Sequence, residues 1–97
     1  MATVVEGDFE WDSAKAASNI TKHGVSFFEA ATVFADGPWP SAVDDGSGTG
    51  VVVVIEMSLR ERLFYVVHAQ RGERDRIISA RPAEPGERAV YETGGVT

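Results

Sequence analysis

Three consecutive segments of β-strand character constrain the fold of this 97-residue chain more than any other feature of its sequence. Residues 51–57, 63–70 and 74–80 are rich in β-branched and aromatic side chains, which favour strands. The connections between them are only a few residues long, and the second contains Gly72. Parallel neighbours need a crossover of a dozen or more residues, so the short connections predict an antiparallel meander. The continuous apolar run of residues 51–57 predicts a strand buried on both faces.

The chain before this meander predicts one short strand and two helices. Residues 6–11 alternate polar and apolar side chains, as a half-buried strand does. Asp12 supplies an acceptor for the free N–H groups of a first helix turn, and Gly24 is suited to end that helix. Ser26 and Glu29 have the spacing of a capping box, which predicts that a second helix begins there.

The other segments predict a loop and a short final helix. Residues 37–50 are rich in glycine, proline and aspartate, a composition typical of a loop. Pro85 suits the first turn of a helix that runs through Glu92, and residues 93–97 are expected to form a frayed tail. The predicted order is β-α-α-β-β-β-α. We therefore expect a single α+β domain over residues 1–97, with the helices packed on one face of an antiparallel sheet.

Charge is distributed unevenly along the chain. The formal net charge of −6 argues against a nucleic-acid-binding protein. Residues 58–81 nevertheless carry six arginines against three acidic residues, whereas residues 1–57 have a net charge of −7. Arginine is the side chain best suited to forked phosphate contacts, so this segment indicates either an anion-binding surface or a solvated hairpin with charged edges. The arginines that we consider as ligands of phosphate or RNA are Arg62, Arg71, Arg74, Arg76 and Arg81.

Several other kinds of site are not expected. The chain has no cysteine and only two histidines, which argues against disulfides and structural zinc, and no cofactor is predicted. Its first residues lack the positive charge of a signal peptide. The longest apolar run, residues 51–55, is far too short to span a membrane. These features favour a cytoplasmic protein that does not enter the membrane.

The strand periodicity brings a histidine close to arginines. Alternate residues share a face of a strand, so we expect His68 and Arg76 on a common face, with Arg81 at the strand end. Such a set suits metal-independent RNA cleavage, in which a base takes the 2′-OH proton, a cation stabilises the phosphorane and an acid protonates the 5′-oxygen. The expected products carry a 2′,3′-cyclic phosphate and a free 5′-OH. His68 fits equally well as a sheet histidine bonded to a backbone carbonyl.

Lys22 and His23 lie at the end of the first predicted helix. Cations at this position interact favourably with the negative end of the helix dipole, so both residues fit a purely structural role. They also fit a second role, in which they hold the RNA backbone or assist proton transfer.

Two sets of residues together resemble the BrnT family of type II toxin–antitoxin toxins. The sets cover roughly residues 9–36 and 62–92, in the order and spacing of the family. The motifs that carry the resemblance are Phe9-Glu10-Trp11-Asp12, Lys15-Ala16, Asn19, Lys22-His23-Gly24-Val25-Ser26-Phe27, Glu29-Ala30, Val66-Val67-His68 and Arg76-Ile77-Ile78-Ser79-Ala80-Arg81. The resemblance implies a RelE-like ribonuclease fold and a toxin that cleaves RNA and inhibits translation.

The resemblance also implies partners and roles for particular residues. It implies a BrnA-type antitoxin with a DNA-binding domain, a toxin–antitoxin heterotetramer, and contact with operator DNA only through that antitoxin. RNA, free or on the ribosome, is the implied substrate. The expected catalytic residues are Lys22, His23, His68, Arg76 and Arg81, and the expected RNA contacts are Arg62, Arg71 and Arg74.

The chain departs from the family pattern in two places. Members of the family usually carry a His/Glu/Arg-containing segment before the second strand, but residues 45–51 contain none of those side chains. Glu56 stands where glycine is common. These departures support an alternative hypothesis, in which the protein is catalytically impaired and acts through antitoxin binding and operon regulation. A third hypothesis is a ParE-like inhibitor of a protein target, because one fold supports several activities.

Overall fold

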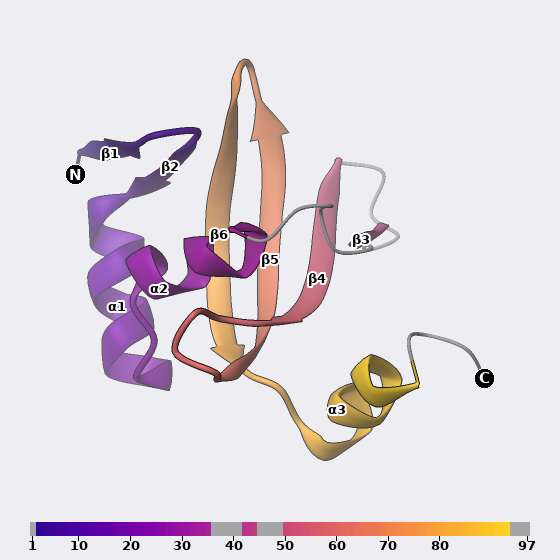
Figure 1. Ribbon diagram of the computed structural model, residues 1–97. Coiled ribbons are helices and arrows are strands. Elements are labelled where there is room, and N and C mark those ends of the chain that lie inside the picture. Colours follow the sequence, from indigo (N-terminus) through magenta and orange to yellow (C-terminus); the bar gives the residue numbers. More distant parts are fainter. Residues whose placement is uncertain (1, 36–41, 45–49, 94–97) are drawn as a thin grey trace.

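A computed structural model describes residues 2–35, 42–44 and 50–93 of the chain. The described part is an α+β fold in which a twisted sheet carries helices beside it (Figure 1). Its elements are β1 (Thr3–Glu6), β2 (Phe9–Asp12), α1 (Ser13–His23), α2 (Phe27–Ala31), the 3-10 turn η1 (Thr32–Phe34), β3 (Ala42–Asp44), β4 (Val51–Met57), β5 (Leu63–Arg71), β6 (Arg74–Pro82) and α3 (Pro85–Glu92).

The sheet has the spatial order β1-β2-β6-β5-β4-β3. The antiparallel meander β4-β5-β6 is confirmed. The expectation of a wholly antiparallel sheet is wrong, because β2 pairs with β6 in parallel, with Glu10 opposite Arg76. The two strands are far apart in sequence, and α1, α2 and the first two strands of the meander lie between them, so the chain has room for the crossover that parallel pairing requires.

The predicted order β-α-α-β-β-β-α lacks two strands that the structure contains. β1 forms an antiparallel hairpin with β2, and Gly7 at its turn has a φ of 59°, which favours glycine. β3 lies within the segment predicted as a loop and pairs with Val52–Val54 of β4. Both short strands complete sheet edges, and such long-range pairing leaves little local signal in a sequence.

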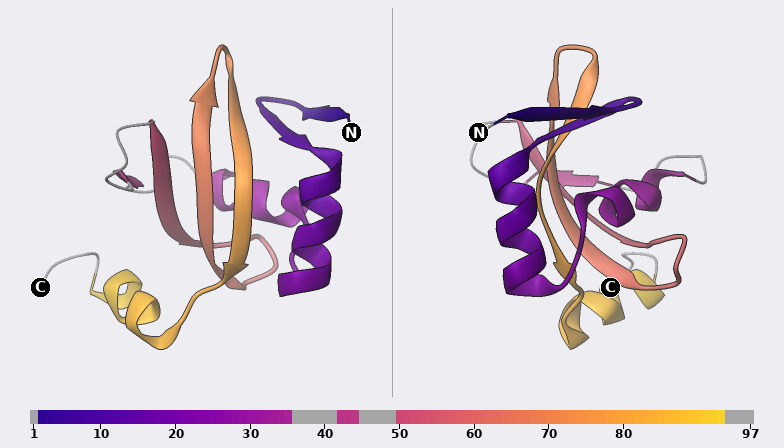
Figure 2. Two further views of the ribbon diagram at one scale, coloured as in Figure 1. Left: turned by 180° about the vertical axis from the view of Figure 1, so that it is seen from behind. Right: turned by 90° about the vertical axis from the view of Figure 1, so that its left-hand side faces the viewer.

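A bulge in β6 decides which side chains share a face of the sheet. Val67 pairs with Ser79, but the next residue, His68, pairs with Ile77, so Ile78 is the extra residue. One face therefore combines Val66 and His68 of β5 with Ile77 and Ala80 of β6. We call it the covered face, because α2 and the side chains of the hydrophobic core pack against it, whereas α1 lies along the edge of β6 (Figure 2), so the expectation that the helices share one face is wrong. The opposite, open face carries Tyr65, Val67, Arg76 and Arg81.

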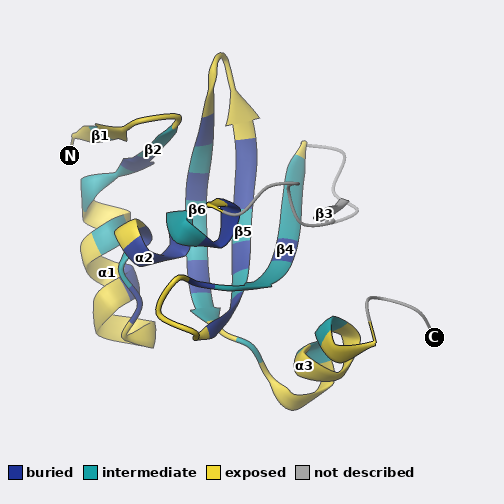
Figure 3. Cartoon of the chain, in the orientation of Figure 1, coloured by how far each residue is buried: buried dark blue, intermediate teal, exposed yellow. Residues whose placement is uncertain are grey.

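The hydrophobic core lies between the covered face and residues 25–34, with the partly buried Ala16 of α1 packed against it. Trp11 of β2 packs edge-on against Phe27 of α2, with ring centroids 6.0 Å apart. The buried hydrophobic residues of this core are Trp11, Val25, Phe27, Ala30, Val33, Phe34, Val54, Phe64, Val66, Ile77 and Ala80. In β4 the prediction of burial on both faces is wrong, because only Val54, at 1% exposure, is fully buried (Figure 3).

The predicted helix boundaries are confirmed where capping residues determine them. The Asp12 side chain accepts from the backbone N–H of Lys15, and Gly24 ends α1 with a φ of 68°. Ser26 accepts from the N–H of Glu29 at 3.1 Å. The carboxylate of Glu29 binds residues of the β4–β5 turn, so its role in the predicted capping box is replaced by a tertiary contact.

α3 has the predicted bounds but a looser attachment than the other helices. It follows β6 and lies beside the end of β4, away from α1 and α2 (Figures 1 and 2). None of its residues is buried. Among the described residues, no helix is long and apolar enough to cross a membrane.

Candidate functional site

The C-terminal ends of α1 and β6 meet at one end of the sheet (Figures 1 and 2). Asn19 joins them. Its side-chain N–H groups donate to the carbonyls of Ala80 at 2.7 Å and Val25 at 2.9 Å, and its Oδ1 accepts from the N–H of Ala80 at 3.2 Å. The amide thus binds both backbone groups of Ala80, as a residue of a neighbouring strand would. Asn19 thereby positions the end of β6, including Arg81, relative to the end of α1.

Lys22 and His23 occupy the last turn of α1, one turn beyond Asn19, and both are exposed. Within the described residues, neither side chain forms an ion pair with a carboxylate. The helix dipole favours cations here, which accounts for their presence structurally. Their exposure also leaves them available to an anionic ligand at this end of the sheet.

Arg62 lies near the same helix end but already has a partner. Its Nε and Nη2 atoms donate to the two carboxylate oxygens of Glu29, at 2.8 Å and 2.5 Å. Ser58 donates to the same carboxylate at 2.9 Å, and Arg62 lies over the ring of Phe64. The hydrogen bond from Arg62 lowers the pKa of Glu29, although burial opposes this change. Arg62 therefore fastens the β4–β5 turn to α2, and the backbone of Gly24 lies 3.5 Å from its Nη2.

His68 lies on the covered face, so the expectation that it shares a face with Arg76 is wrong. Its Nδ1 is 2.9 Å from Oδ1 of Asp75, and its ring contacts that of Phe34 at a centroid distance of 5.0 Å. Since a carboxylate only accepts, the Nδ1–H of His68 donates. His68 is 6% exposed, and its Nε2 has no hydrogen-bond partner within the described part of the chain. The alternative of a sheet histidine is supported, with a carboxylate in place of a carbonyl.

Arg76 lies on the open face and is paired across the parallel strands. Its Nη1 is 2.6 Å from Oε2 of Glu10, the residue opposite it in β2. Arg76 thus shares its face with Arg81, but the two side chains are five positions apart along β6 and bind different carboxylates.

Arg81 is held on three sides. Its two terminal nitrogens each lie 2.7 Å from a different carboxylate oxygen of Glu87 in α3, and its guanidinium lies 4.0 Å from the centre of the Tyr65 ring. Glu84 is 3.7 Å away. The hydrogen bonds that Arg81 donates to Glu87 lower the pKa of Glu87 and raise the pKa of Arg81. The geometry is that of a forked anion site with a carboxylate in it.

Arg71 and Arg74 lie far from this end of the sheet. They pair with each other across the β5–β6 hairpin, beside Gly72, whose φ is 61°. Both are exposed. The hairpin tip is at the opposite end of β6 from Arg81 (Figure 1), so the arginine-rich segment does not form one surface.

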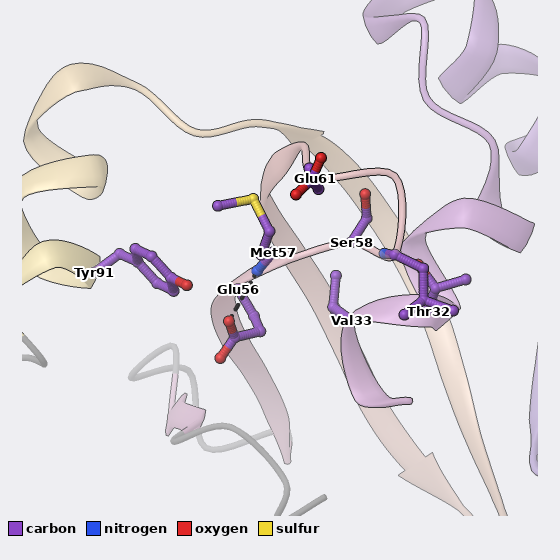
Figure 4. A pocket seen from close by; sticks show the side chains of 8 residues that line it. Thr32, Val33, Glu56, Met57, Ser58, Glu61 and Tyr91 are labelled. Atoms are coloured by element: carbon purple, nitrogen blue, oxygen red, sulfur yellow. Dashed lines mark hydrogen bonds between the residues drawn. The ribbon is translucent and has the colours of Figure 1, made fainter. Parts of the chain in front are cut away.

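A hollow of about 470 Å³ lies between α3, η1 and the β4–β5 turn (Figure 4). Its lining residues are Thr32, Val33, Glu56, Met57, Ser58, Leu59, Glu61 and Tyr91. Burial is the first cause of the raised pKa of Tyr91, and the neighbouring carboxylate of Glu56 adds to it. With two carboxylates and no lysine or arginine in its lining, the hollow is unsuited to a phosphate.

Several residues that shape the site were not predicted. Asn19, Glu10 and Glu87 act on Ala80, Arg76 and Arg81 from other parts of the chain, and no local pattern indicates those pairings. The sequence does indicate the orientation of Asp75. It lies between Arg74 and Arg76 in one strand, and alternation places it on the opposite face from them. Within the described residues, no cluster of three or more His, Cys, Asp or Glu residues is arranged to hold a metal ion. Residues 45–49, which depart from the family pattern, lie outside the described residues.

Comparisons with known proteins agree with the motifs of the sequence. A family model described as the ribonuclease toxin BrnT of type II toxin–antitoxin systems matches residues 11–87. A crystal structure of the ribonuclease toxin BrnT of Brucella abortus matches with a TM-score of 0.59 and 25% sequence identity, over 76% of this chain and 92% of that chain. No curated protein matches the chain. The matched span contains Asn19, both residues of the α1 end, and Arg81 with its partner Glu87.

Proposed function

We propose that this chain, which belongs to the BrnT family of ribonuclease toxins of type II toxin–antitoxin systems, is itself a metal-independent endoribonuclease that inhibits translation. The observation that carries the proposal is the family match, which spans all of α1 and β6 and therefore both elements that form the basic end of the sheet. The RelE-like character of the fold and a cytoplasmic location are parts of the same proposal.

The geometry favours Arg81, Lys22 and His23 as the reacting group of side chains. Arg81 presents a fork that fits two phosphate oxygens, and Lys22 and His23 are exposed at the adjoining end of α1. In the proposed reaction the ribose 2′-OH loses its proton and attacks the adjacent phosphorus. The bond to the 5′-oxygen breaks, and that oxygen gains a proton, leaving a 2′,3′-cyclic phosphate and a 5′-OH.

His68 and Arg76 have weaker geometric support as catalytic residues. His68 reaches RNA only if the layer over the covered face opens, and otherwise acts with Asp75 to hold β5 to β6. Arg76 is bound to Glu10 on the open face. We propose Arg71 and Arg74 as contacts to RNA outside the reacting group, because both are exposed at the hairpin tip.

The test is cleavage of defined single-stranded RNA by the purified protein, with and without ribosomes and with EDTA present, followed by mapping of the ends. We expect 5′-OH and 2′,3′-cyclic phosphate ends, and a loss of rate of at least about 100-fold in His23→Ala and Arg81→Ala. Lys22→Ala should lower the rate as well. Lys15→Ala is its matched control and should not, because both lysines are exposed on α1 but only Lys22 lies at its C-terminal end. Intact RNA under all these conditions would reject the proposal.

A second candidate function is supported by the charge pairing of the arginines. Arg62, Arg76 and Arg81 each hold a carboxylate, and His68 is buried. A protein with this arrangement that does not cleave RNA would act through its BrnA-type antitoxin, in a heterotetramer that reaches operator DNA through the antitoxin. Intact RNA together with tight antitoxin binding would support this candidate. Intact RNA together with inhibition of DNA supercoiling by gyrase would instead indicate a ParE-like inhibitor.

A further inference from the structure

Glu87 occupies Arg81 in the way a phosphate would. Both terminal guanidinium nitrogens bind its two oxygens at 2.7 Å, so a phosphate can take this end-on pair of donors only after the carboxylate leaves it. Oε1 of Glu87 also accepts from the backbone N–H of Glu84 at 2.8 Å, which fixes the orientation of the carboxylate. The guanidinium also lies over the ring of Tyr65. The anion site is therefore formed and filled by the same chain.

The helix that carries this carboxylate is attached to the rest of the molecule by few side chains. No residue of α3 is buried, and none belongs to the hydrophobic core. Within α3 only Glu87 and Tyr91 are half-buried and the other residues are exposed, and Figure 3 shows the helix at the margin of the fold. Release of α3 would therefore expose little apolar surface, and its main costs would be the Arg81–Glu87 ion pair and the contact of Tyr91 with Glu56.

We propose that α3 is a tethered competitor of RNA, in which the Glu87 carboxylate must leave Arg81 before an RNA phosphodiester binds there. The Glu87 carboxylate is anionic, as the phosphodiester is. One can therefore replace the other on Arg81 without a change in the sheet that carries Arg81 and Tyr65. The inference rests on the proposed role of Arg81 in RNA binding. It adds that the resting protein is self-inhibited and that α3 moves when RNA binds.

The experiment measures binding of a single-stranded 2′-O-methyl RNA, which lacks the attacking hydroxyl, so that affinity is measured without cleavage. The variant is Glu87→Gln, because glutamine keeps the acceptor for the N–H of Glu84 and the start of α3 while it removes the charge that holds Arg81. Glu92→Gln is the matched control: it makes the same change of net charge on the same helix, at an exposed residue. Affinity and its dependence on salt are followed by fluorescence anisotropy.

We expect Glu87→Gln to tighten RNA binding about 5- to 10-fold more than Glu92→Gln does, as expected for loss of a charge-assisted, partly exposed pair. In an Arg81→Ala background the advantage should vanish, because no fork remains to be released. Hydrogen exchange at residues 85–92 of the wild-type protein should become faster when the RNA is added.

Other results would distinguish failure of the proposed competitor from failure of the proposed ribonuclease activity. Equal affinities of Glu87→Gln and Glu92→Gln, or an advantage that persists without Arg81, would overturn the competitor. Tighter binding by Glu87→Gln without cleavage of ordinary RNA by any variant would keep the competitor and reject the proposed ribonuclease. Unchanged exchange of α3 on RNA binding would overturn the movement that we infer.

Discussion

Replacement of Asn19 by alanine should destabilise the protein more than any other single change on α1. The substitution removes one buried amide and leaves three backbone groups without a partner: the N–H and C=O of Ala80 and the C=O of Val25. An unsatisfied buried polar group costs about 1–3 kcal/mol. The lower value applies here, because the shortened side chain leaves space for water. The three unsatisfied groups together then cost about 3 kcal/mol.

The helix itself offsets a small part of this loss. Alanine is a better helix former than asparagine by about 0.5 kcal/mol. The expected decrease in the free energy of unfolding is thus about 2–3 kcal/mol. For a domain of this size each kcal/mol corresponds to about 4–8 °C, so the melting temperature should fall by about 10–20 °C.

Urea denaturation followed by circular dichroism measures this change. Ser18→Ala is the control, because Ser18 is the exposed neighbour on the same helix and its removal should change stability by less than about 0.5 kcal/mol. Asn19→Asp should destabilise at least as much as Asn19→Ala, since it puts a carboxylate against two carbonyl oxygens. A loss below about 1 kcal/mol in Asn19→Ala, with an unchanged urea dependence, would refute the argument that this amide replaces a strand neighbour.

Three further predictions concern charge and metal. Glu29→Gln should lower the free energy of unfolding by about 1–3 kcal/mol, because the buried carboxylate accepts from both Ser58 and Arg62, and urea titration measures the loss. The folded-state pKa of Glu29 lies below its ordinary value of 4.5. Its stabilisation is therefore fully present above pH 4.5 and is lost as the pH falls through the folded-state pKa. The urea midpoint should consequently decrease less on acidification in Glu29→Gln than in the wild type. Glu10→Gln should change stability by less than about 1 kcal/mol, because a single hydrogen bond joins Arg76 to Glu10 and both side chains keep contact with solvent; a larger change in the same titration would mean that this pair supports the β2–β6 contact. EDTA should leave the rate of RNA cleavage within about twofold in the proposed mechanism, and a loss that is restored by a divalent cation would contradict it.

The element boundaries that the sequence predicts well are those set by neighbouring residues. Asp12, Gly24 and Ser26 act on backbone groups within a few positions, and Pro85 begins a helix by its own fixed geometry. The meander follows from the short connections between its strands. The β1–β2 hairpin, β3 and the parallel contact of β2 with β6 were missed, because they depend on segments that meet only after folding.

The candidate site divides in the same way. The BrnT motifs and the concentration of arginine are properties of the sequence, and the family match agrees with them. The sequence does not show which side chains share a face of the sheet, because the extra residue Ile78 places His68 and Arg76 on opposite faces. Strict alternation predicts the two together, and a bulge reverses the facing of every residue beyond it.

The sequence by itself therefore determined the family of this protein, its helix ends, its meander and the residues that carry positive charge. Tertiary structure alone decided whether those charges are available. Glu10, Glu29 and Glu87 reach Arg76, Arg62 and Arg81 across 66, 33 and 6 positions of the chain. The reason is physical: capping and periodicity act over a few residues, whereas an ion pair forms wherever folding brings opposite charges together.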